Sequence, residues 1–314
     1  MSTRLRSLTD RCPRPGMGWE EPDCPLCGGH DRITILEAQD PQARGNGLWF
    51  AVVECRSCHL TFTSPRPDQA AIGDFYPIDY APHRPKVDRH ATSAPFAWLR
   101  GRPCVERRIL PRHGRCRLLD FGCGGGSFLE RMHRQGWNVT GLDVSAAAVA
   151  TVERKLGVPA LLGSLPHPDI KLGSFDVITM WHSLEHVHEP LPTLRAAREL
   201  LAPGGKILVA VPNFAGLPFE WFGESWFALD LPRHLVHFTP NTLIAMMAKA
   251  GFASINVRMI RHDDWLRSSA RLACRKPNPP GWQKLLTHKY PARMAAWACY
   301  LLGRSDCMLA TASV

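Results

Sequence analysis

The feature that most constrains this chain is the glycine-rich segment DFGCGGGSFLE, residues 120–130. It places four glycines within five positions, directly after the apolar run CRLL. Glycine allows another group to approach the backbone closely and adopts turn conformations without steric cost. CRLLDFG therefore predicts a buried strand ending in a tight turn, and SFLERMHRQG predicts a helix that ends at Gly136. A strand, a glycine turn and a helix together predict a βα unit that holds a ligand at the turn.

Strands and helices alternate along the rest of the chain. Ser145 caps a predicted helix over residues 145–157, and Thr239 caps another over residues 239–252. A further helix, residues 191–205, ends at Pro-Gly-Gly, and strands are predicted at residues 138–144, 175–181, 206–213, 253–260 and 306–312. This alternation predicts an α/β fold with a Rossmann-like, doubly wound sheet and ligands at the carboxyl ends of its strands.

The glycine segment does not fit a phosphate. A dinucleotide site needs a third glycine where Ser127 stands, and a P-loop needs a lysine that is absent here. Asp120 ends the strand and directs a carboxylate into the loop, where it would repel a pyrophosphate and attract a cationic group. Asp143 ends the next strand, 21 residues after Gly122, where an acid can bind both ribose hydroxyls.

These features favour S-adenosylmethionine (SAM), which has an ammonium, a sulfonium and a ribose but no phosphate. A tight βα turn without a ligand is the less favoured alternative. LLDFGCGGGSFLERM, VTGLDVS, FDVITMWHSLEHV and LLAPGGKILVAVPN, in this order, resemble successive motifs of class I SAM-dependent methyltransferases. The resemblance covers residues 115–260 and extends to the C-terminus through GRSDCMLATA. It implies a seven-stranded sheet whose last strand is antiparallel to the rest.

The resemblance also implies a set of cofactor contacts. The methionine part of SAM would lie against the loop, and Asp143 with Val144 would contact the ribose. Ser164 and Leu165 would lie beside the adenine; because the family often has an acid at the position of Ser164, adenine recognition would depend more on backbone and apolar contacts. The complete set of expected cofactor residues is Asp120, Gly122, Cys123, Gly124, Gly126, Asp143, Val144, Ser164, Leu165, Trp181 and His182.

Two CxxC pairs, Cys24–Cys27 and Cys55–Cys58, enclose 27 residues. Four thiolates in this arrangement suit a closed, tetrahedral structural zinc site, with a small excursion over residues 36–48. A redox CxxC is the less favoured alternative, because a single pair beside a helix start would be expected. CRSCHLTFTSPRP followed by FYPIDY resembles the N-terminal zinc-binding module of some bacterial small-molecule methyltransferases, including sugar C-methyltransferases. That resemblance implies a module covering the substrate side of the catalytic domain.

The pattern divides the chain into four parts. Residues 1–20 are expected to be a disordered basic tail, 21–65 the ribbon-like zinc module, 66–114 a linker with a helical connection, and 115–314 the catalytic domain, with an insertion at 262–303.

No apolar run has the roughly 18 residues of a membrane helix, and the N-terminus lacks the apolar core of a secretory signal. The scattered cysteines suit a reducing compartment, so a cytoplasmic protein is expected.

The net charge of +10 is concentrated in two regions. Residues 98–117 hold seven arginines and one acid, and residues 257–293 hold nine Lys or Arg and two acids. Such regions attract nucleic acid, anionic lipid or a phosphorylated small molecule, or they are simply solvated surface. A nucleic-acid-binding zinc ribbon or an RNA methyltransferase is the alternative function. This alternative function is disfavoured because few aromatic residues lie among the arginines of 98–117.

The segment YPARMAAWACYLLG, residues 290–303, mixes aromatic and basic residues. It suits contact with a lipid surface or with a lipid-linked substrate, and an ordinary packed helix explains it equally well.

Candidate catalytic residues follow the strand FDVITMW. Enzymes that methylate amino groups of bases and glutamines often carry Asn/Asp-Pro-Pro-Tyr here, whereas this chain has Trp181-His182-Ser183-Leu184-Glu185-His186. Imidazoles favour oxygen or carbon nucleophiles that need a base near neutral pH. His186 and His182 are the first candidate bases; the alternative for His182, which comes directly after the strand, is that it packs against the cofactor. A divalent metal on Glu185 and His186, as in some quinone O-methyltransferases, stays open, although two residues do not make a metal site.

A second candidate cluster is DLPRHLVHFT, residues 230–239. Pro232 and the absence of a helical period predict a loop over the strand ends. On that loop Arg233 suits an anionic substrate group and His234 is the second candidate base. The alternative is that Arg233 and His237 only tie the loop to the core; this structural role is favoured for His237 and equally weighted for His234. The main hypothesis is a SAM-dependent O- or C-methyltransferase of a small molecule that is sugar-linked, phosphorylated or lipid-linked. The sequence does not predict its oligomeric state.

Overall fold

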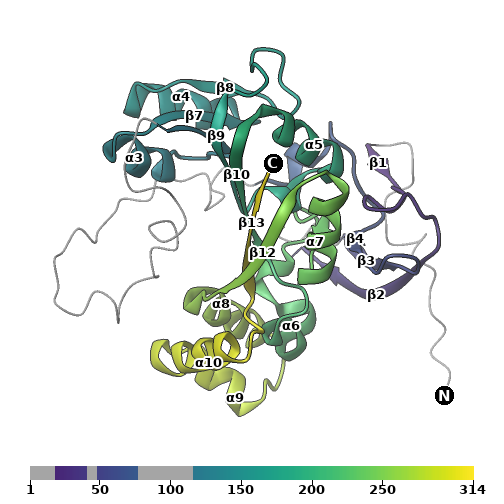
Figure 1. Cartoon of the computed structure of the whole chain (residues 1–314). Coiled ribbons are helices and arrows are strands. Elements are labelled where there is room, and N and C mark those ends of the chain that lie inside the picture. Colours follow the sequence, from purple (N-terminus) through teal and green to yellow (C-terminus); the bar gives the residue numbers. More distant parts are fainter. Residues whose placement is uncertain (1–17, 41–47, 77–115) are drawn as a thin grey trace.

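The computed structural model describes residues 18–40, 48–76 and 116–314 (Figure 1). A seven-stranded sheet forms its centre, in the spatial order β12-β13-β10-β9-β6-β7-β8. These strands are β6 (Arg117–Phe121), β7 (Asn138–Asp143), β8 (Ala160–Leu162), β9 (Phe175–Trp181), β10 (Leu201–Pro212), β12 (Ala253–Ile260) and β13 (Cys307–Ser313). β13 pairs antiparallel with both β10 and β12, whereas β8, β7, β6, β9 and β10 are mutually parallel. The predicted Rossmann-like sheet with an antiparallel last strand is confirmed.

Four helices cover the two faces of the sheet: α3 (Ser127–Arg134), α4 (Ala146–Leu156), α5 (Pro190–Leu200) and α7 (Pro240–Lys249). Leu118 and Val177 point to the cluster formed with α3 and α4, while their neighbours Leu119 and Ile178 point to the cluster formed with α5 and α7. This alternation follows from the two-residue period of a strand. Both faces are apolar because helices bury both.

The helix ends follow the predicted caps. The Oγ of Ser145 accepts a hydrogen bond from the N–H of Ala148, and Gly157 ends α4 in the left-handed conformation. Thr239 and Thr242 form a reciprocal capping box at the start of α7. One boundary differs from expectation: α5 ends at Leu200, and β10 begins at Leu201 with an irregular register before Lys206. The Pro-Gly-Gly segment therefore lies in this irregular start of the strand.

The N-terminal part forms a second, smaller sheet in the order β11-β4-β3-β2. Its first three strands along the chain are β2 (Arg32–Gln39), β3 (Trp49–Cys55) and β4 (Thr61–Thr63). The fourth, β11 (Val236–His237), comes from the C-terminal half of the chain and pairs with β4. The module thus contains a strand that the sequence assigned to a catalytic-domain loop.

The two sheets also share one hydrophobic cluster. Leu60 and Phe62 of the module lie in it together with Leu194 and Leu243 of the catalytic helices. The sequence suggests that the catalytic domain has a core of its own and folds without the module. The expected separate core is wrong, because the module supplies part of the core. Ordered structure also begins before residue 21 and continues past residue 65, since β1 (Trp19–Glu20) pairs with β5 (Arg66–Pro67), and the short helix η2 spans Ile72–Phe75.

Some of the sequence-based predictions lie outside the described residues. These are the predictions for most of the basic tail, for the linker from residue 77 and for nearly all of the arginine-rich segment 98–117. The predicted insertion before the last strand forms three helices, α8 (Asp263–Ala273), α9 (Gly281–Leu286) and α10 (Lys289–Leu301). They make a lobe beside the large sheet, next to α6 (Leu217–Phe222) (Figure 1). In the described part of the chain, no helix has both the length and the apolar character needed to cross a bilayer.

Candidate active site

The sequence-predicted cofactor residues lie at the carboxyl ends of four neighbouring strands. β9, β6, β7 and β8 are adjacent and parallel, so their carboxyl ends form one edge of the sheet. Asp120 lies near the end of β6, Asp143 ends β7, Trp181 ends β9, and Ser164 follows β8 by two residues. Open α/β sheets bind ligands at this edge.

The glycine loop after β6 accepts only glycine at two positions. Gly122 has φ +73°, and a Cβ there would lie 2.6 Å from the Cβ of Ser183. Gly126 also has φ +73°, and a Cβ there would meet Val152 at 2.9 Å. L-residues rarely adopt this backbone region, and the contacts exclude any side chain. The loop therefore lies directly against the residues that follow β9.

The carboxylate of Asp143 organises the loop. Its Oδ2 accepts the N–H of Gly124 at 2.8 Å, and its Oδ1 accepts the N–H of Ser145 at 2.8 Å. A carboxylate has about four acceptor positions, so each oxygen retains a lone pair for a ligand. The next residue, Val144, is 75% exposed, which is unusual for a large apolar side chain at a strand end. Gly163 donates to the carbonyl of Asp143, which holds Ser164 beside this edge.

Asp120 and Cys123 are buried beneath the loop. The Oγ1 of Thr179 donates to Asp120 Oδ1 at 2.7 Å, which fixes the carboxylate within the sheet. Burial, reinforced by the charges of Asp120 and Asp143, raises the pKa of Cys123 well above its ordinary value. Cys123 is therefore a protonated, packed thiol at neutral pH and not a nucleophile.

Trp181 and His182 line the end of β9. The indole of Trp181 packs edge-on against Phe128 of α3, with ring centroids 5.3 Å apart. His182 has φ +54°, and its ring lies 4.8 Å from that of Trp265, which stacks on His262. The left-handed backbone of His182 turns the chain sharply after the strand. It directs the following residues, 183–186, along the carboxyl edge.

Glu185, His186 and His234 form a polar cluster at this edge. One ligand atom from each lies within 4.8 Å of the others, and the rings of His186 and His234 are 4.6 Å apart. The Glu185 side chain is fully buried, and its Oε1 lies 3.5 Å from His182 Nδ1. Neither carboxylate oxygen has a hydrogen bond of ordinary geometry among the described residues. A buried carboxylate is costly unless a positive charge lies beside it, so the cluster favours a cationic group next to Glu185.

The hydrogen bonds of the two imidazoles define their tautomers. His186 Nδ1 lies 2.9 Å from the carbonyl of Arg233, and His234 Nδ1 lies 2.8 Å from the carbonyl of Ala228. A carbonyl only accepts, so in each ring Nδ1–H donates. In a neutral ring this leaves the lone pair on Nε2. Burial first, and the charge of His234 second, lower the pKa of His186 to about 4. Although burial opposes ionisation of Glu185, the three neighbouring histidines hold the pKa of that carboxyl below its usual value.

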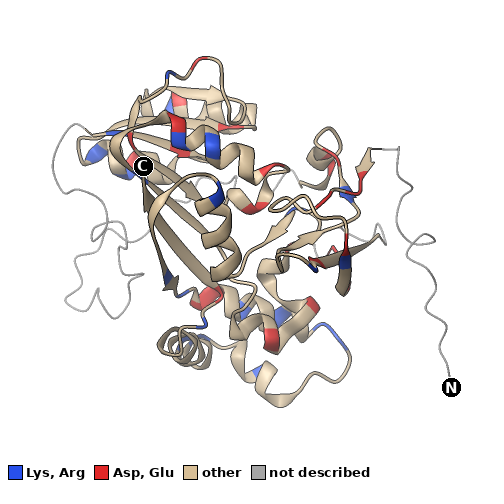
Figure 2. Ribbon diagram, turned by 45° about the vertical axis from the view of Figure 1, so that its right-hand side comes forward, with Lys and Arg blue, Asp and Glu red and all other residues tan. Residues whose placement is uncertain are grey.

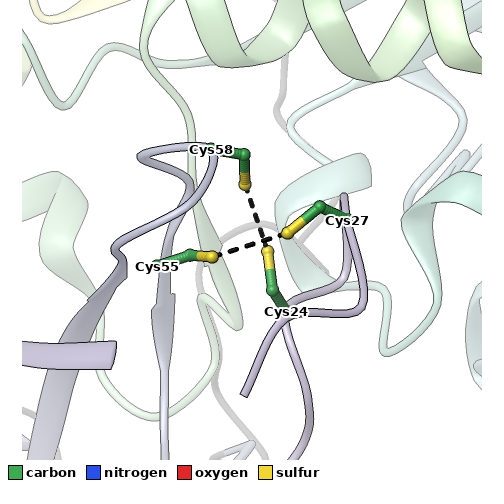
Figure 3. Close-up of side chains that lie close together, drawn as sticks. All are labelled: Cys24, Cys27, Cys55 and Cys58. Atoms are coloured by element: carbon green, nitrogen blue, oxygen red, sulfur yellow. Dashed lines mark hydrogen bonds between the residues drawn. The ribbon is translucent and has the colours of Figure 1, made fainter. Parts of the chain in front are cut away.

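The four cysteines of the CxxC pairs converge in the N-terminal module (Figure 3). Cys24 Sγ lies 3.4 Å from Cys58 Sγ, and Cys27 Sγ lies 3.5 Å from Cys55 Sγ. All four sulfurs lie within 4.8 Å of one another. Zinc–sulfur bonds of about 2.3 Å in a tetrahedron place sulfurs about 3.8 Å apart, so this donor set fits Zn²⁺. The N–H of Gly29 donates to Cys27 Sγ, as expected of a metal-binding knuckle.

Comparison with known proteins identifies the family of the chain. A family model described as "Methyltransferase domain" matches residues 55–257. The chain belongs to this family. It is a SAM-dependent methyltransferase.

Several known proteins resemble this methyltransferase. The ubiquinone biosynthesis O-methyltransferase of Xanthomonas axonopodis pv. citri is 33% identical over 183 residues, which cover 54% of this chain and 75% of that protein. The enzyme of the same name from Xanthomonas euvesicatoria pv. vesicatoria is 33% identical over 171 residues, covering 51% and 71%. A solved SAM-dependent methyltransferase from Mesorhizobium loti is 21% identical, covers 67% of this chain and 96% of that one, and superposes with a TM-score of 0.46.

The geometry of the methyltransferase corrects the interpretation of Arg233. Its side chain is completely buried and forms ion pairs with Asp40 and Asp230 at 2.8 Å. It also donates to the carbonyls of Phe75 and Leu231. These carboxylates and carbonyls accept from all five N–H groups of the guanidinium. Arg233 therefore ties the module to the catalytic domain, and the expectation that it binds an anionic substrate group is wrong.

The expected loop over the strand ends is confirmed in part. Residues 230–239 form no helix, and the N–H of Leu235 donates to the carbonyl of Glu185 after β9, but the segment is not a surface lid. Residues 228–238 are all buried, because β11 within this segment pairs with β4 of the zinc module. His237 Nε2 lies 3.1 Å from the Oγ1 of Thr63, so this histidine ties the segment to the module, as the sequence favoured. The segment thus places His234 beside His186 inside the core and not on a surface lid.

His237 gives the methyltransferase a pH-dependent stability. Burial, with the charge of His234, lowers the pKa of His237 to about 3, against about 6.5 in an unfolded chain. Between these values the unfolded chain binds a proton that the folded one excludes, so stability present above pH ~6.5 is lost as pH falls toward 3. We expect His237 to contribute a slope of roughly 1.4 kcal/mol per pH unit in this range. Urea unfolding of His237→Asn should show a shallower slope than the native protein; equal slopes would contradict this assignment.

Several residues near the site were missed in the sequence. Tyr76 places its hydroxyl 3.1 Å from His186 Nδ1 across 110 positions. Trp265 and His262 surround His182, and Cys307 Sγ lies 4.0 Å from His182 Nε2. His262 lies two residues after β12, so applying the strand-end rule to that strand would have found it. Cys307 begins β13 and lies at the same edge because β13 is antiparallel to β10 and β12.

Proposed function

We propose that this methyltransferase transfers the methyl group of SAM to an oxygen or carbon nucleophile of a small molecule. The cluster of Glu185, His186 and His234 carries the proposal, because it places two imidazoles, of which His186 is neutral, at the edge where the fold binds its ligands. Methyl transfer displaces a neutral thioether, so the leaving group needs no acid. The nucleophile, in contrast, must lose a proton as its bond to the methyl carbon forms. An imidazole Nε2 accepts that proton, and the products are the methylated acceptor and S-adenosylhomocysteine.

We assign the cofactor to the glycine loop and the two strand-end acids. The buried carboxylate of Asp120 lies near the ammonium end, together with the backbone of Gly122, Cys123, Gly124 and Gly126. Asp143 accepts the ribose hydroxyls, and the exposed Val144 packs on the adenosine. Ser164 and Leu165 flank the adenine, and Trp181 and His182 border the methyl end.

Asp143 provides the first test of the cofactor assignment. We expect Asp143→Ala to weaken SAM binding by about 1–3 kcal/mol, since buried ribose hydroxyls lose a charged acceptor. Because Asp143 also holds the loop, Asp143→Asn is a second variant that keeps one acceptor and loses the charge. Calorimetry measures both, with the exposed Asp169→Ala as control. Unchanged affinity in both variants would remove Asp143 from the site.

The acceptor class is narrowed by the corrected role of Arg233. With that guanidinium occupied by Asp40 and Asp230, the proposal for a phosphorylated acceptor loses its support. The names of the similar proteins favour an oxygen nucleophile and an amphiphilic ring. The sugar-linked alternative depends only on the resemblance of the zinc module. A panel of catechols, phenols, nucleotide sugars and lipid-linked acceptors, read by release of S-adenosylhomocysteine, separates them; turnover of amines alone would contradict the proposal.

A divalent cation is the alternative occupant of the cluster. His234 adds a third ligand to Glu185 and His186, which removes the objection that two residues cannot make a site. A chelator that abolishes turnover without releasing the zinc, with recovery on adding Mg²⁺, would favour the cation over a simple base.

We also propose one structural zinc on Cys24, Cys27, Cys55 and Cys58, and a location in the cytoplasm, where the thiols stay reduced.

The alternative function, nucleic-acid binding, has little to support it. Arg117, the one arginine of the segment 98–117 among the described residues, pairs with Asp176 at 2.8 Å. A steep salt dependence of RNA binding would be the observation in its favour.

A further inference from the structure

Helix α10 buries small side chains and exposes large apolar ones. The residues that it buries against the lobe are small, Ala292, Ala296 and Cys299. Its large apolar residues Tyr290, Met294, Trp297 and Leu301 are exposed, with exposed fractions of 75%, 74%, 43% and 77%. Their spacing of four, three and four residues places them on one face of the helix. A helix that serves only the core has the opposite arrangement.

Further exposed apolar residues lie near α10, on the packed helix α9 and directly after α10. We call the whole set the lobe face; its members are Trp282, Leu285, Tyr290, Met294, Trp297, Tyr300, Leu301 and Leu302, all exposed. Trp282 and Leu285 belong to α9, which packs against α10. Contiguous exposed apolar residues of this kind mark interaction sites, whereas single ones do not.

The lobe is strongly basic. Residues 263–304 contain eight Lys or Arg and two acids, Asp263 and Asp264. Four of the eight basic residues pair with acids: Arg267 with Asp264 and Arg293 with Asp263 inside the lobe, and Lys276 with Glu224 and Arg304 with Glu220 outside it. The other four, Arg271, Arg275, Lys284 and Lys289, form no ion pair within the described ranges 18–40, 48–76 and 116–314. Figure 2 marks the basic residues of the lobe in blue.

We infer that the lobe face docks on an anionic lipid bilayer. Tryptophan and tyrosine prefer the interface of a bilayer, leucine and methionine enter its hydrocarbon edge, and unpaired Lys and Arg attract acidic headgroups. A second copy of the chain fits less well, because two such lobes would bring like charges together. A nucleic acid also fits less well, since leucine and methionine have no aromatic plane on which bases stack.

The lobe lies next to the candidate active site. α8 follows the carboxyl end of β12, and Trp265 in its first turn contacts His182 directly after β9. Arg261, at the same strand end, stacks on Trp297 of the lobe face at 4.1 Å from the ring centroid. Docking would therefore bring the carboxyl edge of the sheet to the membrane surface. The family match ends at residue 257, so the lobe lies outside the part shared with that family.

Vesicle cosedimentation tests the inference without relying on catalysis. The native protein should bind vesicles with phosphatidylglycerol at low salt, and bind phosphatidylcholine vesicles more weakly. The double variant Met294→Ser with Leu301→Ser should reduce binding about tenfold or more, because two large side chains no longer enter the bilayer. Leu172→Ser is a matched control, since Leu172 is 73% exposed but lies outside the lobe. The double variant Lys284→Glu with Lys289→Glu should reduce binding about tenfold or more, against Lys171→Glu as control.

The results distinguish a lipid bilayer from a second copy of the chain and from a nucleic acid as the partner of the lobe face. Because the altered side chains are exposed, the variants should keep the native SAM affinity, which confirms that they are folded. Binding that the lobe variants leave unchanged, or an absence of binding to anionic vesicles, would overturn the inference. A dimer that Leu301→Ser dissociates would overturn it in favour of a second copy, and tighter binding to RNA than to vesicles would overturn it in favour of a nucleic acid.

Discussion

Replacing His186 by alanine should lower kcat by roughly 10²–10⁴-fold while SAM affinity changes little. The tautomer of His186 leaves Nε2 free to accept a proton, since Nδ1–H donates to the carbonyl of Arg233. The lowered pKa, about 4, keeps the ring neutral at physiological pH, so no activity is lost to protonation until the pH approaches that value. His234→Ala should have an effect of the same order, because its ring contacts that of His186.

Matched variants separate a catalytic base from a structural role. His186→Asn keeps a donor for the Arg233 carbonyl and removes the basic nitrogen, so it should be as inactive as His186→Ala. His188→Ala, two residues further along, removes a ring bonded to the carbonyl of Pro67 and should keep kcat near the native value. Full activity in the double variant His186→Ala with His234→Ala would show that alignment of the acceptor with the methyl group is sufficient for the reaction.

Loss of the zinc should have the largest effect on stability. We expect Cys24→Ser or Cys58→Ser to release one zinc per chain and to unfold the N-terminal module, because binding of a structural zinc supplies folding free energy. The effect should extend to the catalytic domain, since β11 pairs with β4 and both sheets share a hydrophobic cluster. Removing residues 1–76 should therefore leave a chain that does not fold to a stable, SAM-binding domain.

Elemental analysis and thermal unfolding check this prediction. Cys116→Ser and Cys274→Ser are suitable controls, because both cysteines are partly exposed and lie outside the cluster of four. They should retain the metal and the native melting temperature. Freshly purified, reduced protein without bound metal would contradict the zinc assignment, and a catalytic domain that melts normally without the module would contradict the shared core.

The position of the candidate cofactor residues at the carboxyl edge was predictable because its signals are local. Each of these residues lies at a strand end or within a few positions after it, and parallel pairing of the strands brings those ends together. Gly122 and Gly126 have the positive φ values that their sequence implied. Ser145 and Gly157 likewise bound α4 because capping depends on neighbours within one turn.

Contacts between distant segments were not predictable. Arg233 looked like an anion site because its partner Asp40 lies 193 positions away. His234 looked like part of a lid because nothing in DLPRHLVHFT reveals that Val236 and His237 complete the sheet of the module. In α10, apolar residues occur all round the helix, so the periodicity did not indicate which face is buried. These features depend on tertiary packing, which a single sequence does not encode by spacing.

The most direct test of the account is the structure of the complex with SAM, or with S-adenosylhomocysteine and an acceptor. We expect the methionine part against the glycine loop, the ribose on Asp143, and the methyl group directed toward the Nε2 atoms of His186 and His234, with room for one acceptor between them. A cofactor bound elsewhere, or a methyl group separated from both imidazoles by the packed core, would contradict the proposed mechanism.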